Sequence, residues 1–278
     1  MESNQIHMVS RRSFISKGVT AAAAVIVAPS IYSRNFFSGA NSPLTGKKVL
    51  YVWGGWMGHE PDKCRDIFVP WMESEGAKVT VSDTLEAYVS MDLKKDFDLI
   101  IQAWTMGTIE SKQEKALLEA VKSGVGLAGW HGGLGDSFRN NTEYQFMVGG
   151  QWVAHPGGVI DYRVNIIDHK DPVTKGLTDF DMHSEQYYVH VDPNVKVLAA
   201  TTFTDKNASW IGGNVVPVVW KKVYGSGRVF YSSLGHVASD FNVPQALEIQ
   251  KRGICWACMS KFEPAEAWKQ PVYKTEKK

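Results

Sequence analysis

Four short strand-like runs alternate with helical patterns over the first half of the chain. Cys64, Ile67, Phe68, Trp71 and Met72 recur at the spacing of an amphipathic helix, and a second helical pattern follows at 110–122. The runs that flank these helices are 49–53, 78–81, 97–103 and 125–130. Strands that alternate with helices, and that are apolar on both sides, are typical of a parallel sheet buried on both faces. The pattern therefore predicts an α/β fold.

The second half of the chain changes to a strand-rich pattern. Residues 159–166 alternate apolar and polar side chains, and Gly225-Ser226-Gly227 has the composition of a hairpin connection. A last amphipathic helix is expected from Pro244 to about Met259. We expect a doubly wound, mostly parallel sheet with β-rich additions in the C-terminal half. It forms one domain over 41–260, followed by a surface tail at 261–278.

Residues 1–40 have the pattern of an export signal. Arg11 and Arg12 precede an apolar stretch at 19–27, which is too short to span a bilayer. The segment resembles a twin-arginine signal, and small residues favour cleavage before Asn41. We therefore expect a periplasmic protein whose first partner is the twin-arginine translocase. The alternative is a basic amphipathic helix that packs on the domain.

Composition excludes several classes of partner and cofactor. The chain has 30 Lys and Arg against 29 Asp and Glu, so it lacks the basic footprint of a nucleic-acid binder. The phosphate-binding pattern G-x-x-x-x-G-K-[ST] does not occur, and Gly132-Gly133-Leu134-Gly135 is only a partial match to a glycine-rich phosphate loop, so no NAD, flavin or nucleotide is expected. The sequence leaves open whether the protein forms a homo-oligomer.

Tryptophan marks the ends of three predicted strands. Trp53, Trp104 and Trp130 each close an apolar run, and glycines follow two of them. Ligands of an open parallel sheet bind beyond the carboxyl ends of its strands, and indole faces suit the apolar face of a sugar ring. The three indoles are therefore interpreted as a sugar-stacking platform. The alternative is that they belong to the core.

Histidines form the second candidate site. Five of them lie in glycine-rich or turn-like contexts, where functional side chains concentrate: His59, His131, His155, His183 and His236. Glu185 stands two residues after His183, on the same face of an extended segment. Such a set can hold a divalent ion, with zinc preferred, or it can be a metal-free acid–base group. Both interpretations stay open at this point.

Three segments resemble the ThuA-like, or trehalose-utilisation, family. They are 124–133 (GVGLAGWHGG), the neighbourhood of Glu185 and Tyr187, and 217–236, which contains GRVFYSSLGH. The resemblance implies a fold similar to class I glutamine amidotransferases, with a flavodoxin-like sheet and a sharp elbow after a central strand. Amidotransferases carry cysteine at the elbow, whereas Trp130-His131-Gly132 stands there in this chain. Glutamine hydrolysis by the usual route is therefore excluded, and His236 falls near the amidotransferase general base.

The resemblance also implies a role in sugar metabolism. We expect a hydrolase, lyase or isomerase that acts on a glycoside or keto-sugar. His131 and His236 are assigned to proton transfer. Glu185 is assigned to binding a divalent ion or orienting water, together with His59, His155 or His183. Gln186 and Tyr187 join the three tryptophans as substrate-binding residues. The alternatives are a non-catalytic sugar-binding or scaffold module, and a metal-dependent hydrolase of non-sugar substrates.

Overall fold

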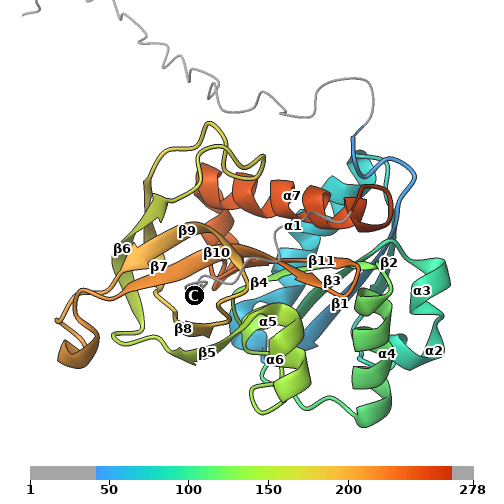
Figure 1. Ribbon diagram of the computed structural model, residues 1–278, viewed down its shortest axis with the longest axis horizontal. Coiled ribbons are helices and arrows are strands. Elements are labelled where there is room, and N and C mark those ends of the chain that lie inside the picture. The colour runs from blue at the N-terminus through green and yellow to red at the C-terminus, as the bar shows by residue number, and fades with distance from the viewer. Residues whose placement is uncertain (1–41, 265–278) are drawn as a thin grey trace, which may run out of the picture. The chain divides into compact units, whose positions relative to one another are not determined.

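The computed structural model describes residues 42–264, which are built around one nine-stranded sheet (Figure 1). The predicted leader at 1–40 and nearly all of the predicted tail lie outside the described residues. The strand order is β2-β1-β3-β4-β11-β10-β9-β6-β7. The bounds are β1 Lys48–Gly55, β2 Lys78–Ser82, β3 Leu99–Thr105, β4 Gly126–Trp130, β6 Val159–Ile166, β7 Phe180–Glu185, β9 Lys196–Thr202, β10 Val215–Tyr224 and β11 Gly227–Ser232.

The first half of the sheet is parallel, as the alternation of strands and helices predicts. β2, β1, β3, β4 and β11 all run in the same direction. β3 and β4 are buried on both faces because helices cover each side. The carboxyl ends of these strands therefore meet at one edge of the sheet, where a functional site is expected.

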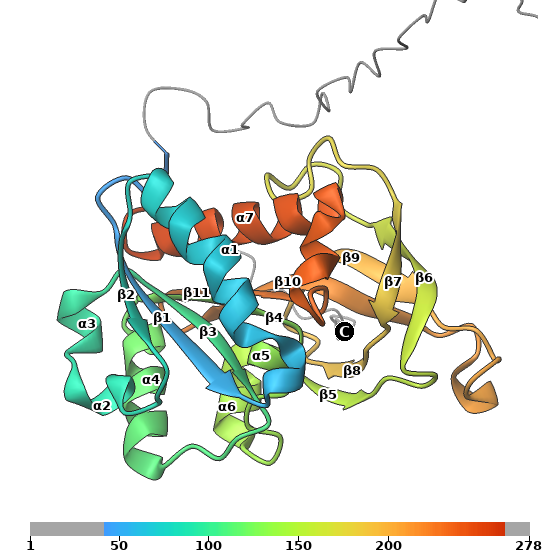
Figure 2. The same cartoon turned by 180° about the vertical axis from the view of Figure 1, so that it is seen from behind.

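Helices pack on both faces of the sheet, as Figures 1 and 2 show. On one face, α1 (Pro61–Ser74) and α7 (Pro244–Cys258) bury Phe68 and Ile254 against the strands. On the other face, Leu117 and Tyr144 belong to a second core. That side carries α2 (Ala87–Ser90), α3 (Leu93–Asp96), α4 (Ser111–Lys122), α5 (His131–Gly135) and α6 (Thr142–Val148).

The second half of the sheet is antiparallel, which corrects the expectation of a mostly parallel sheet. β10 turns back from β11 through the predicted Gly225–Gly227 connection, and β9, β6 and β7 continue in antiparallel pairs. The β-rich additions thus extend the same sheet. β6 meets β9 only through Asn165 and Ile166, so β6 and β7 are attached to the sheet by one end.

A separate two-stranded sheet covers part of the edge where the parallel strands end. β5 (Gly150–Ala154) pairs with β8 (Tyr188–Val191), and neither strand was expected from the sequence. Both strands are short, which explains why the sequence does not reveal them. Four short 3₁₀ helices complete the fold: η1 (Met57–His59), η2 (Ser209–Ile211), η3 (Ala238–Asn242) and η4 (Met259–Lys261).

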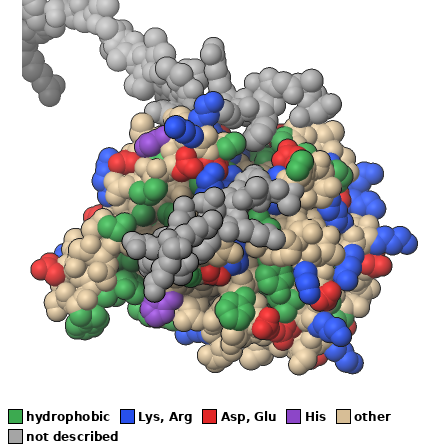
Figure 3. Space-filling view, viewed as in Figure 1, with side chains coloured by type: hydrophobic (Ala, Val, Ile, Leu, Met, Phe, Trp, Pro, Cys, Tyr) green, Lys and Arg blue, Asp and Glu red, His purple; other side chains and the backbone are tan. Residues whose placement is uncertain are grey.

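The surface agrees with the near-neutral composition. Basic and acidic side chains are interspersed over the face shown in Figure 3. Within residues 42–264, we find no helix with the length and apolar character needed to cross a bilayer.

Candidate functional site

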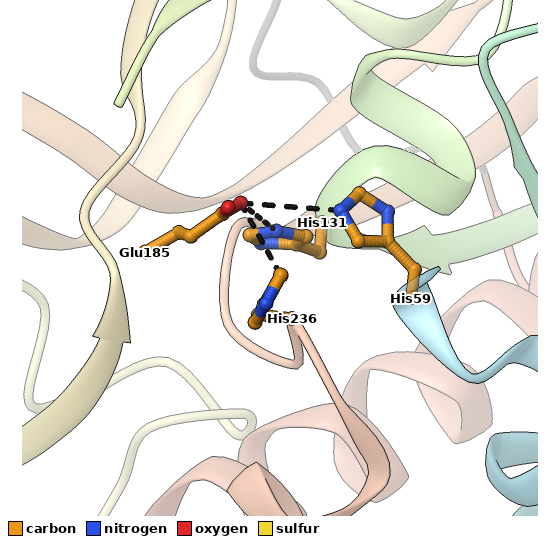
Figure 4. A group of neighbouring side chains, drawn as sticks. All are labelled: His59, His131, Glu185 and His236. Atoms are coloured by element: carbon orange, nitrogen blue, oxygen red, sulfur yellow. Dashed lines mark hydrogen bonds and ion pairs between the residues drawn. The ribbon is translucent and has the colours of Figure 1, made fainter. Parts of the chain in front are cut away.

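Three histidines and one glutamate converge beyond the carboxyl ends of the strands (Figure 4). His59 ends η1 after β1, His131 directly follows β4, and His236 lies in the loop after β11. Glu185 is the last residue of β7 and reaches the group from the antiparallel half of the sheet. One ligand atom from each of the four residues lies within 4.8 Å of the others. We call these four residues the His/Glu cluster.

The backbone turns sharply at His131. Its φ of 46° lies in the left-handed region, which is uncommon for a residue other than glycine and is found where function requires it. The turn joins β4 to α5 and places the imidazole on the cluster. Gly132 then allows a close approach, because a Cβ there would lie 2.4 Å from Cε1 of His59. The sharp elbow implied by the family resemblance is therefore present at this position.

The Glu185 carboxylate is the centre of the cluster. Oε2 lies 3.1 Å from Nε2 of His131, 3.2 Å from Nδ1 of His236 and 3.9 Å from Nε2 of His59. The second oxygen, Oε1, lies 3.6 Å from Nδ1 of His155, which stands beside the cluster. Four imidazole nitrogens therefore surround one buried carboxylate.

The tautomer of His131 leaves a lone pair that faces the carboxylate. Nδ1 of His131 donates to the Ser233 carbonyl oxygen at 2.8 Å, so Nε2 is the unprotonated nitrogen of the neutral ring. Nε2 and the Glu185 oxygen are then two acceptors 3.1 Å apart. Within residues 42–264, Nδ1 of His155 and Nδ1 of His236 are buried and have no partner with hydrogen-bond geometry. This arrangement calls for a cation between the imidazoles and the carboxylate.

Burial keeps the imidazoles of His59 and His131 neutral. Desolvation, followed by the neighbouring His131 and His236, lowers the pKa of His59 to about 3. Desolvation also lowers the pKa of His131, although Glu185 and the Ser233 carbonyl oppose the shift. For Glu185, burial raises the pKa, but the contacts with His131 and His236, which favour the carboxylate when their facing nitrogens carry a proton, outweigh it and hold the pKa well below its usual value. At neutral pH the cluster therefore combines the neutral imidazoles of His59 and His131 with an ionised carboxylate.

The donor set fits a divalent transition metal. Neutral imidazole and carboxylate are the protonation states that bind zinc and its neighbours. Ligand atoms of a tetrahedral zinc site lie about 3.3 Å apart, given metal–ligand distances of about 2.0–2.1 Å. The distances from Glu185 to His131 and His236 match this value, and the 3.9 Å distance to His59 is about 0.6 Å longer than it. Thr105 and the Ser233 carbonyl hold the outer nitrogens of His59 and His131, as partners of metal-bound histidines commonly do.

The three expected platform tryptophans are not brought together. Trp130 is only 3% exposed and packs between Phe68 and Phe241. Trp53 packs against the same core, whereas Trp104 packs against the core on the opposite face of the sheet. The reason is that side chains alternate between the two faces along a strand, so equivalent strand ends do not present equivalent faces.

The other expected residues are placed as follows. His155 and Tyr187 lie at the cluster, with the Tyr187 ring stacked on His131 at 3.8 Å between centroids. Gln186 points to β9, where it donates to Thr201 at 2.7 Å. His183 is not in the cluster: its side chain is 72% exposed and pairs with Asp161 across β6 and β7. β7 is buried at Glu185 but exposed at His183, so the shared face with Glu185 does not bring His183 inside.

The structure adds residues that the sequence did not indicate. Trp56 is 46% exposed and meets His59 edge-on at 4.7 Å. Thr105 bonds to His59, and Trp152 lies near His155 and Tyr187. Arg139 stacks on Trp152 at 4.1 Å. Trp56 follows β1 directly and Thr105 is the last residue of β3, so their position was a usable signal. No sequence signal indicated Trp152 and Arg139, because strand β5 itself was not expected.

Comparison with known proteins places this geometry in a family. The family model ThuA, described as trehalose utilisation, matches residues 48–257. A ThuA-like protein from Bacteroides uniformis is 17% identical, with a TM-score of 0.63, over 80% of this chain and 94% of its own. A ThuA-like protein from Parabacteroides merdae is also 17% identical, with a TM-score of 0.61, over 77% of this chain and 90% of its own. No curated protein matches the chain. Because the family model covers most of its length, the chain belongs to the ThuA family.

Proposed function

We propose that this protein is a carbohydrate-active enzyme whose reaction centre is the His/Glu cluster. The observation that carries the proposal is the convergence of three imidazoles and one carboxylate from four separate elements to within 4.8 Å. The substrate class comes from the family, whose description is trehalose utilisation. The exposed Trp56 beside the cluster supports it, because sugar rings stack on such aromatic faces.

We propose further that the cluster holds a divalent metal ion, with zinc preferred. His59, His131, Glu185 and His236 are the ligands, and His155 stands outside this set, beside the second oxygen of Glu185. A bound ion would act as a Lewis acid on a sugar carbonyl or hydroxyl oxygen. The protein's own contribution is to fix the tautomer of His131 through Ser233 and to exclude water around Glu185.

The substrate is proposed to be a glycoside or a keto-sugar, and the reaction a hydrolysis, an elimination or an isomerisation. In a keto-sugar, the hydrogen next to the carbonyl is the acidic one. Its removal by a base sends the electron pair to the carbonyl oxygen. Return of that pair either expels the neighbouring glycosidic oxygen, as in a lyase, or leads to protonation at the adjacent carbon, as in an isomerase. All three reactions need proton transfer in a water-poor site.

The fold and the location complete the proposal. The amidotransferase-like, doubly wound arrangement is supported by the His131 elbow after β4 and by helices on both faces.

Residues 1–40, which lie outside the described residues, are proposed to direct export to the periplasm through the twin-arginine translocase. Cysteine is absent from the elbow, so the chemistry differs from glutamine hydrolysis.

The test joins metal analysis to sugar turnover. Full-length protein is analysed for bound zinc, manganese, iron and nickel, and it is then incubated with disaccharides and 3-keto-glycosides. We expect about one metal ion per chain and a sugar product. Glu185→Gln should lower metal affinity by roughly 10–100-fold or more, whereas the exposed control His183→Ala should match the wild type. Equal metal content in wild type and Glu185→Gln, or no product from any sugar, would contradict the proposal.

A further inference from the structure

A pocket lies beside Arg139, whose guanidinium stacks on Trp152 next to the His/Glu cluster. It has a volume of about 360 Å³, which falls within the range of small-molecule sites. Its walls come from two loops, one that follows β3 and one that joins α5 to α6. The lining residues are Met106, Gly107, Thr108, Ile109, Phe138, Arg139, Asn140 and Asn141. Neither loop contributes a residue to the cluster itself.

The two walls of the pocket are held together by backbone hydrogen bonds. The Met106 N–H donates to the Asp136 carbonyl at 3.0 Å, and the Gly107 N–H donates to the Ser137 carbonyl at 2.7 Å. Met106 adopts a φ of 50°, a conformation that costs a residue other than glycine roughly 1–2 kcal/mol. The backbone is thus held in an unfavourable conformation to keep this shape, and the pocket is largely formed before a ligand arrives.

Arg139 separates the pocket from the reaction centre. Its guanidinium donates to both carboxylate oxygens of Asp136 and lies over the Trp152 ring, with Cζ 4.1 Å from the ring centroid. Asp136 is almost fully buried, so the pair has no net charge and its orientation is fixed. Nη1 of Arg139 has no acceptor among residues 42–264 and remains available to a ligand. A neutral, rigid donor beside an aromatic ring suits a hydroxyl-rich neutral ligand better than an anion.

Contacts between aromatic rings connect Trp152 to the His/Glu cluster. Trp152 lies 6.1 Å from Tyr187, which stacks on His131, and 5.7 Å from His155. Two indole N–H groups nearby, those of Trp104 and Trp152, are buried without a hydrogen-bond partner in the described part of the chain. The Trp104 N–H abuts the pocket, since a Cβ on Gly107 would lie 2.5 Å from it. Buried indole donors normally find an acceptor, and ligand oxygens could supply one.

We propose that this pocket is a second sugar subsite, which holds the neutral ring adjacent to the sugar unit at the His/Glu cluster. Arg139 donates to hydroxyls of that ring, and Phe138 and Ile109 supply apolar contacts. The inference rests on the proposed carbohydrate function and narrows it: the substrate is an oligosaccharide or glycoside with at least two sugar rings.

The test compares disaccharide and monosaccharide binding to full-length protein by calorimetry. The probes are glucose and a panel of α- and β-linked glucose disaccharides. We expect at least one disaccharide to bind about 10-fold more tightly than glucose. Asn140→Trp places a bulky ring in the pocket, away from the cluster, and should reduce the disaccharide affinity to that of glucose. Lys206→Trp, at an exposed position on another loop, is the matched control and should keep the full difference.

A second variant separates the role of Arg139 from simple blocking. Arg139→Lys keeps a positive charge for Asp136 but loses the planar fork, so it should weaken disaccharide binding and leave glucose binding within about twofold. Equal affinity for glucose and every disaccharide in the wild type would overturn the subsite alone. A preference for a disaccharide over glucose that remains in both Asn140→Trp and Arg139→Lys would also overturn the subsite alone. No binding of any sugar would instead overturn the proposed carbohydrate function together with the subsite.

Discussion

At the scale of single residues, small groups decide whether the His/Glu cluster can form. The Ser233 carbonyl selects the tautomer of His131, and the Thr105 hydroxyl holds the outer nitrogen of His59. Gly132 leaves the space that the His59 ring occupies. None of these three residues touches the centre of the site, yet each determines where an imidazole nitrogen points.

Substitution of Gly132 tests this control. In Gly132→Ala the new Cβ would lie 2.4 Å from Cε1 and 2.6 Å from Nδ1 of His59, so the ring must move away from the cluster. We expect zinc affinity to fall about 10-fold, which is the usual effect of disturbing a ligand's support. Zinc titration by calorimetry measures this affinity, and circular dichroism checks that the variant keeps its fold. Ser90→Ala on exposed α2 is the control, and unchanged zinc affinity in Gly132→Ala would contradict the argument.

At the scale of elements, η3 connects the two halves of the sheet at the site. Asp240 in η3 accepts from the Ser184 hydroxyl of β7 at 2.6 Å and from the His236 N–H at 2.9 Å. Glu60, at the start of α1, accepts from the Ala238 N–H at 3.2 Å. The end of β7, the loop after β11 and the start of α1 are therefore linked through one short helix. Glu185 and His236 depend on that link for their relative position.

Removal of Asp240 should affect stability and metal binding together. In Asp240→Ala the Ser184 hydroxyl and the His236 N–H lose a buried acceptor, which costs about 1–3 kcal/mol of unfolding free energy. Zinc affinity should also fall, because Glu185 and His236 are no longer held together. Urea denaturation and zinc titration measure the two effects. Asp161→Ala, at an exposed carboxylate, is the control, and wild-type values in Asp240→Ala would show that η3 does not position the site.

At the scale of the whole molecule, the site depends on joining a parallel half-sheet to an antiparallel one. β1, β4 and β11 bring their histidines to one edge, as strands of a parallel sheet must. Glu185 arrives from the far end of the strand order, on β7. Burying neutral histidines around one carboxylate in this way makes the stability of the metal-free protein depend on pH.

Acid should destabilise the metal-free protein. His59 has a pKa of about 3 when folded and about 6.5 when unfolded, so the unfolded chain binds more protons between these values. Stability is therefore retained above pH 6.5 and falls as the pH drops toward 3, by up to about 1.4 kcal/mol per pH unit for one histidine. The lowered pKa of Glu185 adds a loss in the same direction below about pH 4.5. Urea denaturation in EDTA at pH 7.5, 6.0 and 5.0 measures the slope.

Replacement of His59 identifies the source of that slope. His59→Gln cannot take up a proton and should show a smaller loss of stability on acidification than the wild type. His183→Ala is the control, since that histidine is exposed and lies outside the cluster, and it should keep the wild-type slope. Stability that is flat or higher at pH 5.0 in the wild type would refute the proposed cause.

The sequence alone determined the local elements and indicated the histidines of the cluster. The periods of apolar side chains predicted β1, β3, β4, α4 and the β10–β11 hairpin, because these patterns arise from neighbours along the chain. The ends of parallel strands, together with glycine-rich contexts, indicated His59, His131 and His236. The GRVFYSSLGH segment indicated the family that the comparisons confirm.

Tertiary structure alone decided which of these groups meet. The direction of β6, β7 and β9 depends on long-range pairing, and this pairing brought Glu185 to the cluster while it left His183 in solvent. The register and twist of a strand decide to which face of the sheet its last side chain points. Trp130 therefore lies in the core, and Trp53 and Trp104 lie on opposite faces of the sheet. Local sequence patterns indicate which side chains are buried, but not which other side chains they contact. Those contacts depend on strand order, and strand order is a property of the folded sheet.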